Sequence, residues 1–209
     1  TDLLQIVAGA GDLEITGQPG MESAIIKATV CASEAEYSEQ SGLDITSGAT
    51  ARIATIMPEV EWRSGWGSSR YLYMDLEISV PDSMQLDIRD SSGDLSLRRV
   101  GSVVVQDSSG DIEVNTAVSV EMKDSSGDIE LEEISGDVVI IADSSGDIRG
   151  ENIGGSVLVA RDSSGDIRFR DVGADFLVER DSSGDIEAKT VAGDFSVLKD
   201  GSGTIRYSD

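Results

Sequence analysis

Aspartate is the residue type that could do the most chemistry in this sequence, because it recurs at fixed spacing inside one phrase. The phrase Asp-Ser-Ser-Gly-Asp occurs six times, beginning at Asp90, Asp107, Asp124, Asp143, Asp162 and Asp181. A shortened copy begins at Asp200, and successive first residues are separated by 17, 17, 19, 19, 19 and 19 residues. A period near 20 residues indicates a solenoid, in which each repeat forms one rung that stacks on the next.

Stacked rungs would place the aspartates in two lines of carboxylates. Unit charges about 4.8 Å apart, the spacing of neighbouring strands, repel by roughly 1 kcal/mol even in water. Hydrogen bonds to turn backbone, solvent and nearby cations would offset this repulsion. The cations directly before the phrase are Arg89, Lys123, Arg161, Arg180 and Lys199.

Calcium is the alternative explanation for the lines of carboxylates, because this hard ion binds carboxylate and carbonyl oxygens. The candidate ligands are Asp107, Asp111, Asp124, Asp128, Asp143, Asp147, Asp162, Asp166, Asp181 and Asp185. The phrase matches neither the EF-hand loop nor the nine-residue calcium repeat. The adjacent Arg and Lys residues would also repel a divalent cation. We therefore prefer a turn role for these aspartates and predict no cofactor, with a calcium-binding array as the second hypothesis.

Catalysis is not predicted for the repeated residues. Carboxylates about 5–5.5 Å apart are typical of a retaining glycosidase, so a polysaccharide-active β-helix enzyme is a third hypothesis. Every rung would offer the same pair, however, whereas an enzyme normally has one special site. The sequence has no histidine, the commonest general base. Repeated serines without a neighbouring base are typical of turns rather than of nucleophiles.

The residues between the phrases predict two short strands in each rung. Apolar residues alternate after the phrase, as in Ile129 and Leu131, and only Gly150 interrupts this pattern. In the 19-residue repeats a second turn precedes strands at 138–140, 157–159, 176–178 and 195–197. Rungs of 17–19 residues are too short for helical connections between parallel strands. The sequence therefore predicts an all-β fold, a parallel β-helix (β-solenoid), with Ile129, Ile148 and Ile167 in a buried column.

The two 17-residue rungs differ from the others in the position of their apolar residues. Apolar residues precede the next phrase by two and four positions there, at Val105 and Val103, but by three and five positions at Ile140 and Val138. A slip of one residue would turn these side chains to the other face of the strand. We therefore expect a β-bulge or a reshaped corner at the transition.

The N-terminal part departs from the regular period. Residues 3–17 resemble a rung, whereas 18–80 contain only strand-like stretches, at 24–31, 51–57 and 72–80. The end of a solenoid exposes unpaired strand edges and must be covered. We therefore predict one elongated domain over 1–209, with irregular N-terminal rungs and a cap in 1–80 and regular rungs in 81–209.

One segment of the predicted cap has the composition of a binding surface. The candidates for contact with a partner are Trp62, Arg63, Trp66, Arg70 and Tyr71. Exposed Trp, Tyr and Arg dominate binding hot spots, although the two Trp rings could instead plug the open end of the rod. The chain is only 4% aromatic, which makes this cluster distinctive.

Composition excludes several classes of partner. The chain has 40 acidic and 16 basic residues and a net charge of −24, which argues against binding to nucleic acid or anionic membrane. There is no apolar run long enough to span a membrane. Because Thr1 is not an initiator Met, we expect that a targeting or anchoring segment has been removed. Strand edges would allow end-to-end or edge-mediated self-association.

Three sequence features together resemble a bacterial family of adhesin-like proteins with β-strand repeats, the DUF4097 group. They are the leading Gly11-Asp12-Leu13, the strand that ends in Val80-Pro81, and the iterated Ser-Gly-Asp-Ile and Gly-Asp-Val/Phe pairs. The resemblance covers essentially the whole chain. It implies an exported β-helix at the bacterial cell surface, in the periplasm or in the extracellular space. It also implies a non-enzymatic, adhesion-type protein that binds a surface, a glycan or a protein.

Overall fold

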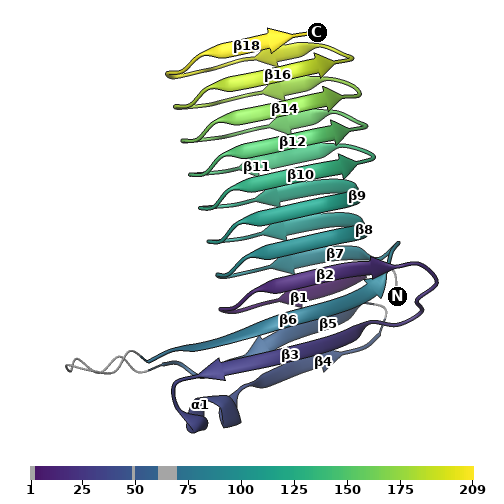
Figure 1. Ribbon diagram of the computed structural model, residues 1–209, viewed down its shortest axis with the longest axis vertical. Coiled ribbons are helices and arrows are strands. Elements are labelled where there is room, and N and C mark those ends of the chain that lie inside the picture. The colour runs from purple at the N-terminus through teal and green to yellow at the C-terminus, as the bar shows by residue number, and fades with distance from the viewer. Residues whose placement is uncertain (1–2, 49, 61–69) are drawn as a thin grey trace.

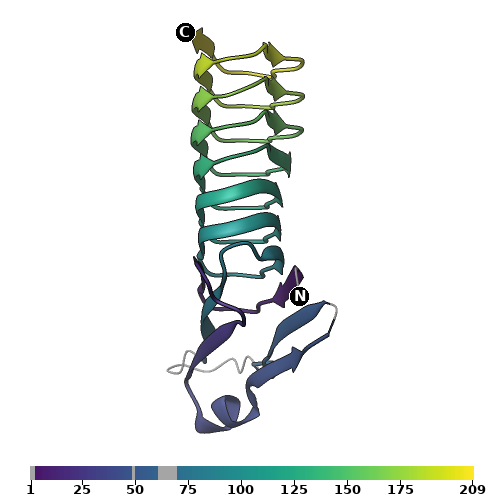
Figure 2. The same ribbon diagram turned by 90° about the vertical axis from the view of Figure 1, so that its right-hand side faces the viewer.

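The computed structural model describes residues 3–48, 50–60 and 70–209, which form a tall rod of stacked strands (Figure 1). Two parallel faces run along the rod, and each regular rung contributes one strand to each face (Figure 2). On one face lie β10 (Ile129–Ile134), β12 (Ile148–Ile153), β14 (Ile167–Val172), β16 (Ile186–Val191) and β18 (Ile205–Ser208). On the other lie β11 (Val138–Ala142), β13 (Val157–Val159), β15 (Phe176–Val178) and β17 (Phe195–Val197).

The strands of each face pair in parallel with the equivalent strand one rung away. Ile129 of β10 aligns with Ile148 of β12, which aligns in turn with Ile167 of β14. Strands β8 (Leu95–Gln106) and β9 (Ile112–Lys123) are longer and contribute to both faces of their rungs. The predicted parallel β-solenoid is therefore confirmed.

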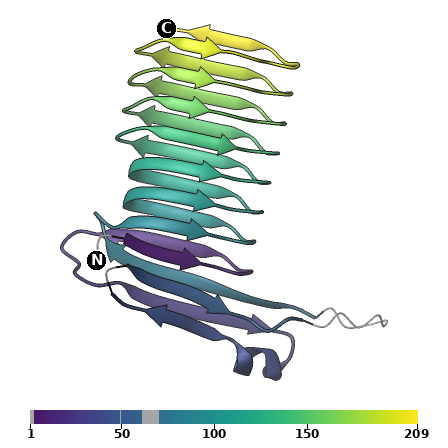
Figure 3. The same cartoon turned by 180° about the vertical axis from the view of Figure 1, so that it is seen from behind.

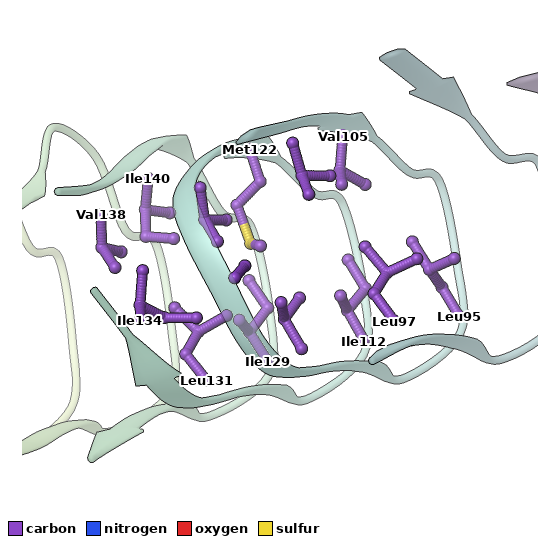
Figure 4. Close-up of a cluster of buried hydrophobic side chains, with 14 of the residues drawn as sticks. Leu95, Leu97, Val105, Ile112, Met122, Ile129, Leu131, Ile134, Val138 and Ile140 are labelled. Carbon is purple, nitrogen blue, oxygen red and sulfur yellow. The ribbon is translucent and has the colours of Figure 1, made fainter. Parts of the chain in front are cut away.

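The core is a continuous apolar column enclosed by the two faces. Figure 4 shows Leu95, Leu97, Ile112 and Ile129 pointing inward from one face toward Val105 and Met122 on the other. The three isoleucines predicted to be least accessible, Ile129, Ile148 and Ile167, are all completely buried. Alternation along each strand thus places one side chain in the core and the next in solvent.

Gly150, which interrupts the apolar alternation, makes room for an aromatic ring. A Cβ atom placed on Gly150 would lie 2.1 Å from the ring of Phe169 on the next rung. Phe169 is itself buried, and its ring centroid lies 5.5 Å from that of Phe176 on the opposite face. The absence of a side chain at Gly150 therefore leaves space for the ring of Phe169.

The 17- and 19-residue rungs differ at two places. Ala117 aligns with Ile134 and Val120 with Val138, so that the later rung has one extra residue at the corner. A second extra residue, Ile141, forms a bulge between Ile140 and Ala142. The expected bulge and reshaped corner are both present.

The first rung of the chain lies inside the rod rather than at its end. Strand β1 (Leu3–Val7) pairs with both β5 (Ala51–Ile56) and β7 (Gln85–Arg89). Strand β2 (Leu13–Gln18) likewise pairs with both β6 (Leu72–Pro81) and β8. Strands β5 and β6 thus lie on one side of the first rung, and β7 and β8 lie on the other side. Residues 3–17 form a rung as predicted, but the sequence did not indicate this order.

Two antiparallel strands extend the N-terminal end of the rod. Strand β3 (Ile25–Ala32) pairs with β6, and β4 (Gly42–Thr46) pairs with β5. The short helix α1 (Ala35–Gln40) lies between them in the sequence and buries Tyr37 (Figure 3). We call β3, α1 and β4 the cap. No helix in the described part of the chain is long and apolar enough to cross a membrane.

Candidate functional site

The glycine of the repeated phrase lets successive turns stack at close range. Gly127 and Gly146 have φ values of 136° and 131°, a region that L side chains rarely adopt. A Cβ atom on either residue would lie 1.8 Å from the carbonyl oxygen of the equivalent glycine on the preceding rung. Every rung therefore requires glycine at this position.

The second aspartate of the phrase joins each rung to the next. The backbone N–H of Asp128 donates to Oδ1 of Asp111 at 2.9 Å, and that of Asp147 donates to Asp128 at 2.9 Å. The same bond continues along the rod, and at its N-terminal end Asp12 and Asp75 take part in it. We call this set the outer aspartates: Asp12, Asp75, Asp94, Asp111, Asp128, Asp147, Asp166 and Asp185.

Arginine side chains bridge neighbouring outer aspartates. Arg149 pairs with Asp147 on its own rung and with Asp128 on the preceding rung, the latter at 2.9 Å. Arg168 bridges Asp166 and Asp147 in the same way. The hydrogen bond from the Asp147 backbone, together with Arg149, holds the pKa of Asp128 below its usual value. These contacts offset the repulsion expected for a line of carboxylates.

The first aspartate of the phrase has the opposite environment. We call this set the inner aspartates: Asp90, Asp107, Asp124, Asp143, Asp162 and Asp181, all of which are buried. Turn N–H groups reach some of them, and Ser164 N–H, for example, donates to Oδ1 of Asp162 at 3.2 Å. At least one carboxyl oxygen of every inner aspartate is buried without a hydrogen-bond partner in the described part of the chain.

The cations before the phrase do not neutralise the inner aspartates. Arg161, Arg180 and Lys199 are exposed, and no ion pair within the described residues joins a basic side chain to an inner aspartate. Their expected role as counter-charges to the first aspartate is therefore wrong. Alternation explains this, because the residue before a buried side chain points to the other face. The arginines that do neutralise carboxylates lie two residues after the phrase.

The repeated serines are also used within the turns. The second serine of a phrase donates its hydroxyl to the first serine's carbonyl on the preceding rung, as from Ser164 to Ser144 at 3.2 Å and from Ser183 to Ser163 at 3.2 Å. In the hydrogen bonds of the described residues these hydroxyls donate to backbone carbonyls and not to the side chain of a general base, which a nucleophile would need. Within the described ranges, no three His, Cys, Asp or Glu side chains converge as metal ligands would. The second serine, the glycine and the second aspartate of the phrase thus make inter-rung contacts, whereas the side chain of the first aspartate does not in the described part of the chain.

The predicted partner-binding residues lie only partly within the described ranges. Trp62, Arg63 and Trp66 fall in 61–69, outside the described residues. Arg70 contacts the cap, pairing with Glu34 at 3.0 Å and with the Tyr37 hydroxyl at 3.2 Å. Tyr71 is half exposed and directly precedes β6.

Sequence reasoning missed a second exposed aromatic residue beside Tyr71. The ring centroid of Tyr73 lies 6.1 Å from that of Tyr71, and both rings are exposed. The strict alternation of β6 could have revealed it, because Met74, Leu76 and Ile78 are buried and the odd-numbered residues must face outward. We call Tyr71 and Tyr73 the tyrosine pair.

This arrangement defines the class of protein: a β-solenoid whose repeated polar motif serves the stacking of its rungs. The family model Toastrack DUF4097 matches residues 24–209, and the chain belongs to that family. The resemblance seen in the sequence is thereby confirmed.

Two solved structures are similar to this chain. One is a "putative adhesin" from Bacteroides fragilis, with 16% identity and a TM-score of 0.49, covering 100% of this chain and 92% of that one. The other is a "putative cell adhesion protein" from Clostridium sporogenes, with 16% identity and a TM-score of 0.33, covering 99% of this chain and 91% of that one. The comparison with curated proteins found no match.

Proposed function

We propose that this chain is a non-enzymatic, adhesion-type rod that is exported by a bacterium and binds a surface, a glycan or a protein. The observation that carries the proposal is the use of the repeated motif. Its outer aspartates, second serines and glycines contact the neighbouring rung, so we infer that the repeats supply a scaffold rather than a reaction site. Membership of the Toastrack family supports the same view.

We further propose that the partner binds at the tyrosine pair. Tyr73 lies in β6, where it pairs with Cys31 of β3, and Tyr71 directly precedes this strand. The backbone of Tyr71 is held by Ser33, whose N–H donates to the Tyr71 carbonyl at 3.0 Å. The backbones of both tyrosines are thus held by hydrogen bonding or strand pairing to residues 31–33, which keeps the entropic cost of binding low. Tyrosine is enriched in binding hot spots because it combines a large apolar ring with a polar hydroxyl.

The proposal can be tested with the purified 209-residue chain on glycan arrays and on immobilised bacterial and host-cell surface extracts. The variant Tyr71→Ser/Tyr73→Ser should lose at least about tenfold in affinity for any ligand found, since truncating one hot-spot residue costs 1–2 kcal/mol or more. The matched control is Val104→Ser/Val118→Ser, which removes two exposed apolar residues from the flank of the rod. Equal loss in both variants, or no loss in the tyrosine variant, would contradict the proposed surface.

A further inference from the structure

The inner aspartates form an uninterrupted column of buried carboxyl groups along the rod. Their backbones are joined from rung to rung. The N–H of Asp124 donates to the backbone carbonyl of Ala142 at 2.9 Å, and the N–H of Asp143 donates to the backbone carbonyl of Arg161 at 2.9 Å. Each donor and acceptor lie on neighbouring rungs, so equivalent carboxyl groups are about 4.8 Å apart along the column. Only 1–6% of each inner aspartate is exposed, so bulk solvent screens their charges poorly.

The ionisable groups that act on this column are all acidic. Asp12 acts on Asp90, and Asp111 acts on Asp124. Asp128 acts on Asp143, whereas Asp166 and Asp200 act on Asp181. The other charges that raise the pKa of inner aspartates are those of the neighbouring inner aspartates, as for Asp107 and Asp162. The basic residues that precede the phrase are exposed, and none of the ion pairs among the described residues joins them to the column: Arg89, Lys123, Arg161, Arg180 and Lys199.

A fully ionised column would therefore be very unfavourable. Burying a carboxylate without a counter-charge costs several kcal/mol, and a second one at the same depth adds repulsion. Two carboxyl groups that share a site relieve this by keeping a proton between them. The unpaired oxygens on Asp107, Asp143 and their neighbours are the acceptors that such protons require.

We propose that the inner aspartates share protons as a ladder, in which a protonated carboxyl on one rung donates its O–H to the carboxylate of the next. The proton joins two rungs and removes one negative charge from the interior. When the chain unfolds above the ordinary pKa of aspartate, each retained proton is released to solvent. The rod is consequently a structure that acid strengthens. This inference is independent of the proposed binding function.

The pKa values of the inner aspartates are raised above the usual value for aspartate, which supports the ladder. Burial, with repulsion from neighbouring carboxylates, raises the pKa of Asp90 and Asp162 to about 7. The same causes raise the pKa of Asp107 and Asp143 to about 6. A folded-state pKa above the unfolded value means that the folded chain binds more protons. The ladder is therefore fully stabilising below about pH 4, and its contribution falls as the pH rises toward 7.

Thermal unfolding between pH 4.5 and 8 tests the ladder. The melting temperature of the native chain should fall by roughly 5–10 °C over this range, as proton linkage at a few such groups requires. The variant Asp124→Asn/Asp143→Asn/Asp162→Asn keeps the side-chain shape and removes the titrating group at three of the six inner positions, so its slope should be clearly flatter. The matched control, Asp94→Asn/Asp147→Asn/Asp185→Asn, changes three outer aspartates that are not among the acidic groups named above as acting on the column, and it should keep the native slope.

Infrared spectroscopy of the native chain with ¹³C-labelled aspartate provides a second readout that needs no variant. A carboxylic-acid C=O band that persists at pH 6 and disappears on unfolding would support the ladder. The proposal is overturned if that band is absent at pH 6. It is also overturned if the melting temperature does not fall between pH 4.5 and 8, or if the inner-aspartate variant keeps the native slope.

Discussion

The two aspartates of each repeated phrase have different roles although only three residues separate them. Asp143 is buried and carries two unpaired oxygens, whereas Asp147 accepts the N–H of Asp166 at 2.8 Å and pairs with two arginines. The turn between them reverses the direction of the side chain. The sequence predicts that both lie in columns, but alternation does not continue through a turn. Their opposite burial therefore could not be predicted from the sequence.

Removing an outer aspartate should destabilise the rod in proportion to the contacts that it makes. Asp147→Ala deletes the acceptor for Asp166 N–H and both arginine contacts, and we expect a loss of about 1–3 kcal/mol. Asp111→Ala, the matched control, deletes only the acceptor for Asp128 N–H among the described contacts and should cost about 0.5–1.5 kcal/mol. Urea unfolding measures both values. Equal losses would show that the arginine bridges contribute nothing.

One corner residue in each rung has a left-handed backbone. Its φ lies between 52° and 65° at Arg99, Thr116, Glu133, Asn152, Asp171 and Thr190. Asparagine and aspartate tolerate this conformation, whereas a β-branched residue is strained in it. Thr190→Asn should therefore stabilise the chain by about 1 kcal/mol, and Asn152→Thr should destabilise it by a similar amount. Denaturation midpoints of the two variants check this, and shifts of the same sign would contradict it.

At the scale of elements, adjacent rungs are coupled through side-chain volume. The Gly150–Phe169 pair on β12 and β14 is the clearest case, because the ring occupies the space that a Cβ atom would fill. Gly150→Ala should cost about 1–3 kcal/mol through overpacking. In the Phe169→Leu background the same change should cost measurably less. A double-mutant cycle in urea gives the coupling, and additive effects would mean that the ring does not need this space.

The regular elements could be predicted from the sequence because each rung repeats the same alternation. Strands β10 to β17 follow it, with Ile134 and Ile153 buried at the corners between the two faces. The cap could not be predicted in the same way. Strand β4 and helix α1 are too short to carry a recognisable period, and β4 has little buried surface. Insertion of the first rung between β5 and β7 depends on tertiary pairing that no local pattern encodes.

At the scale of the whole molecule, the acidic groups of the repeats divide into a buried set and a set at the surface. The inner aspartates lie inside the turns, and the outer aspartates lie along one edge beside Arg149, Arg168 and Arg206. The proposed partner-binding residues, the tyrosine pair, lie beside the cap and outside the repeated motif. The solenoid architecture and the acidic character follow from the sequence, whereas the division of the acidic groups into two sets needs the structure.

This division determines how the rod should respond to cations. Exposed charges repel one another less as salt shortens the Debye length from about 30 Å at 0.01 M to about 3 Å at 1 M. The net charge is −24, so the melting temperature should rise smoothly with NaCl. Millimolar Ca²⁺ should add little at matched ionic strength, because Oδ1 of Asp128 and Asp147 already accepts a backbone N–H.

Calcium binding between rungs would give a different result. Binding to the folded state alone adds about 2.7 kcal/mol per site at a hundredfold excess over Kd, and several sites would raise the melting temperature well beyond the NaCl control. The decisive comparison is Ca²⁺ against NaCl at equal ionic strength for the native chain and for Asp147→Asn/Asp166→Asn. A calcium-specific rise that this variant abolishes would show that the outer aspartates bind the ion. We expect the two salts to give the same curve, because Arg149 and Arg168 already occupy the carboxylate edge.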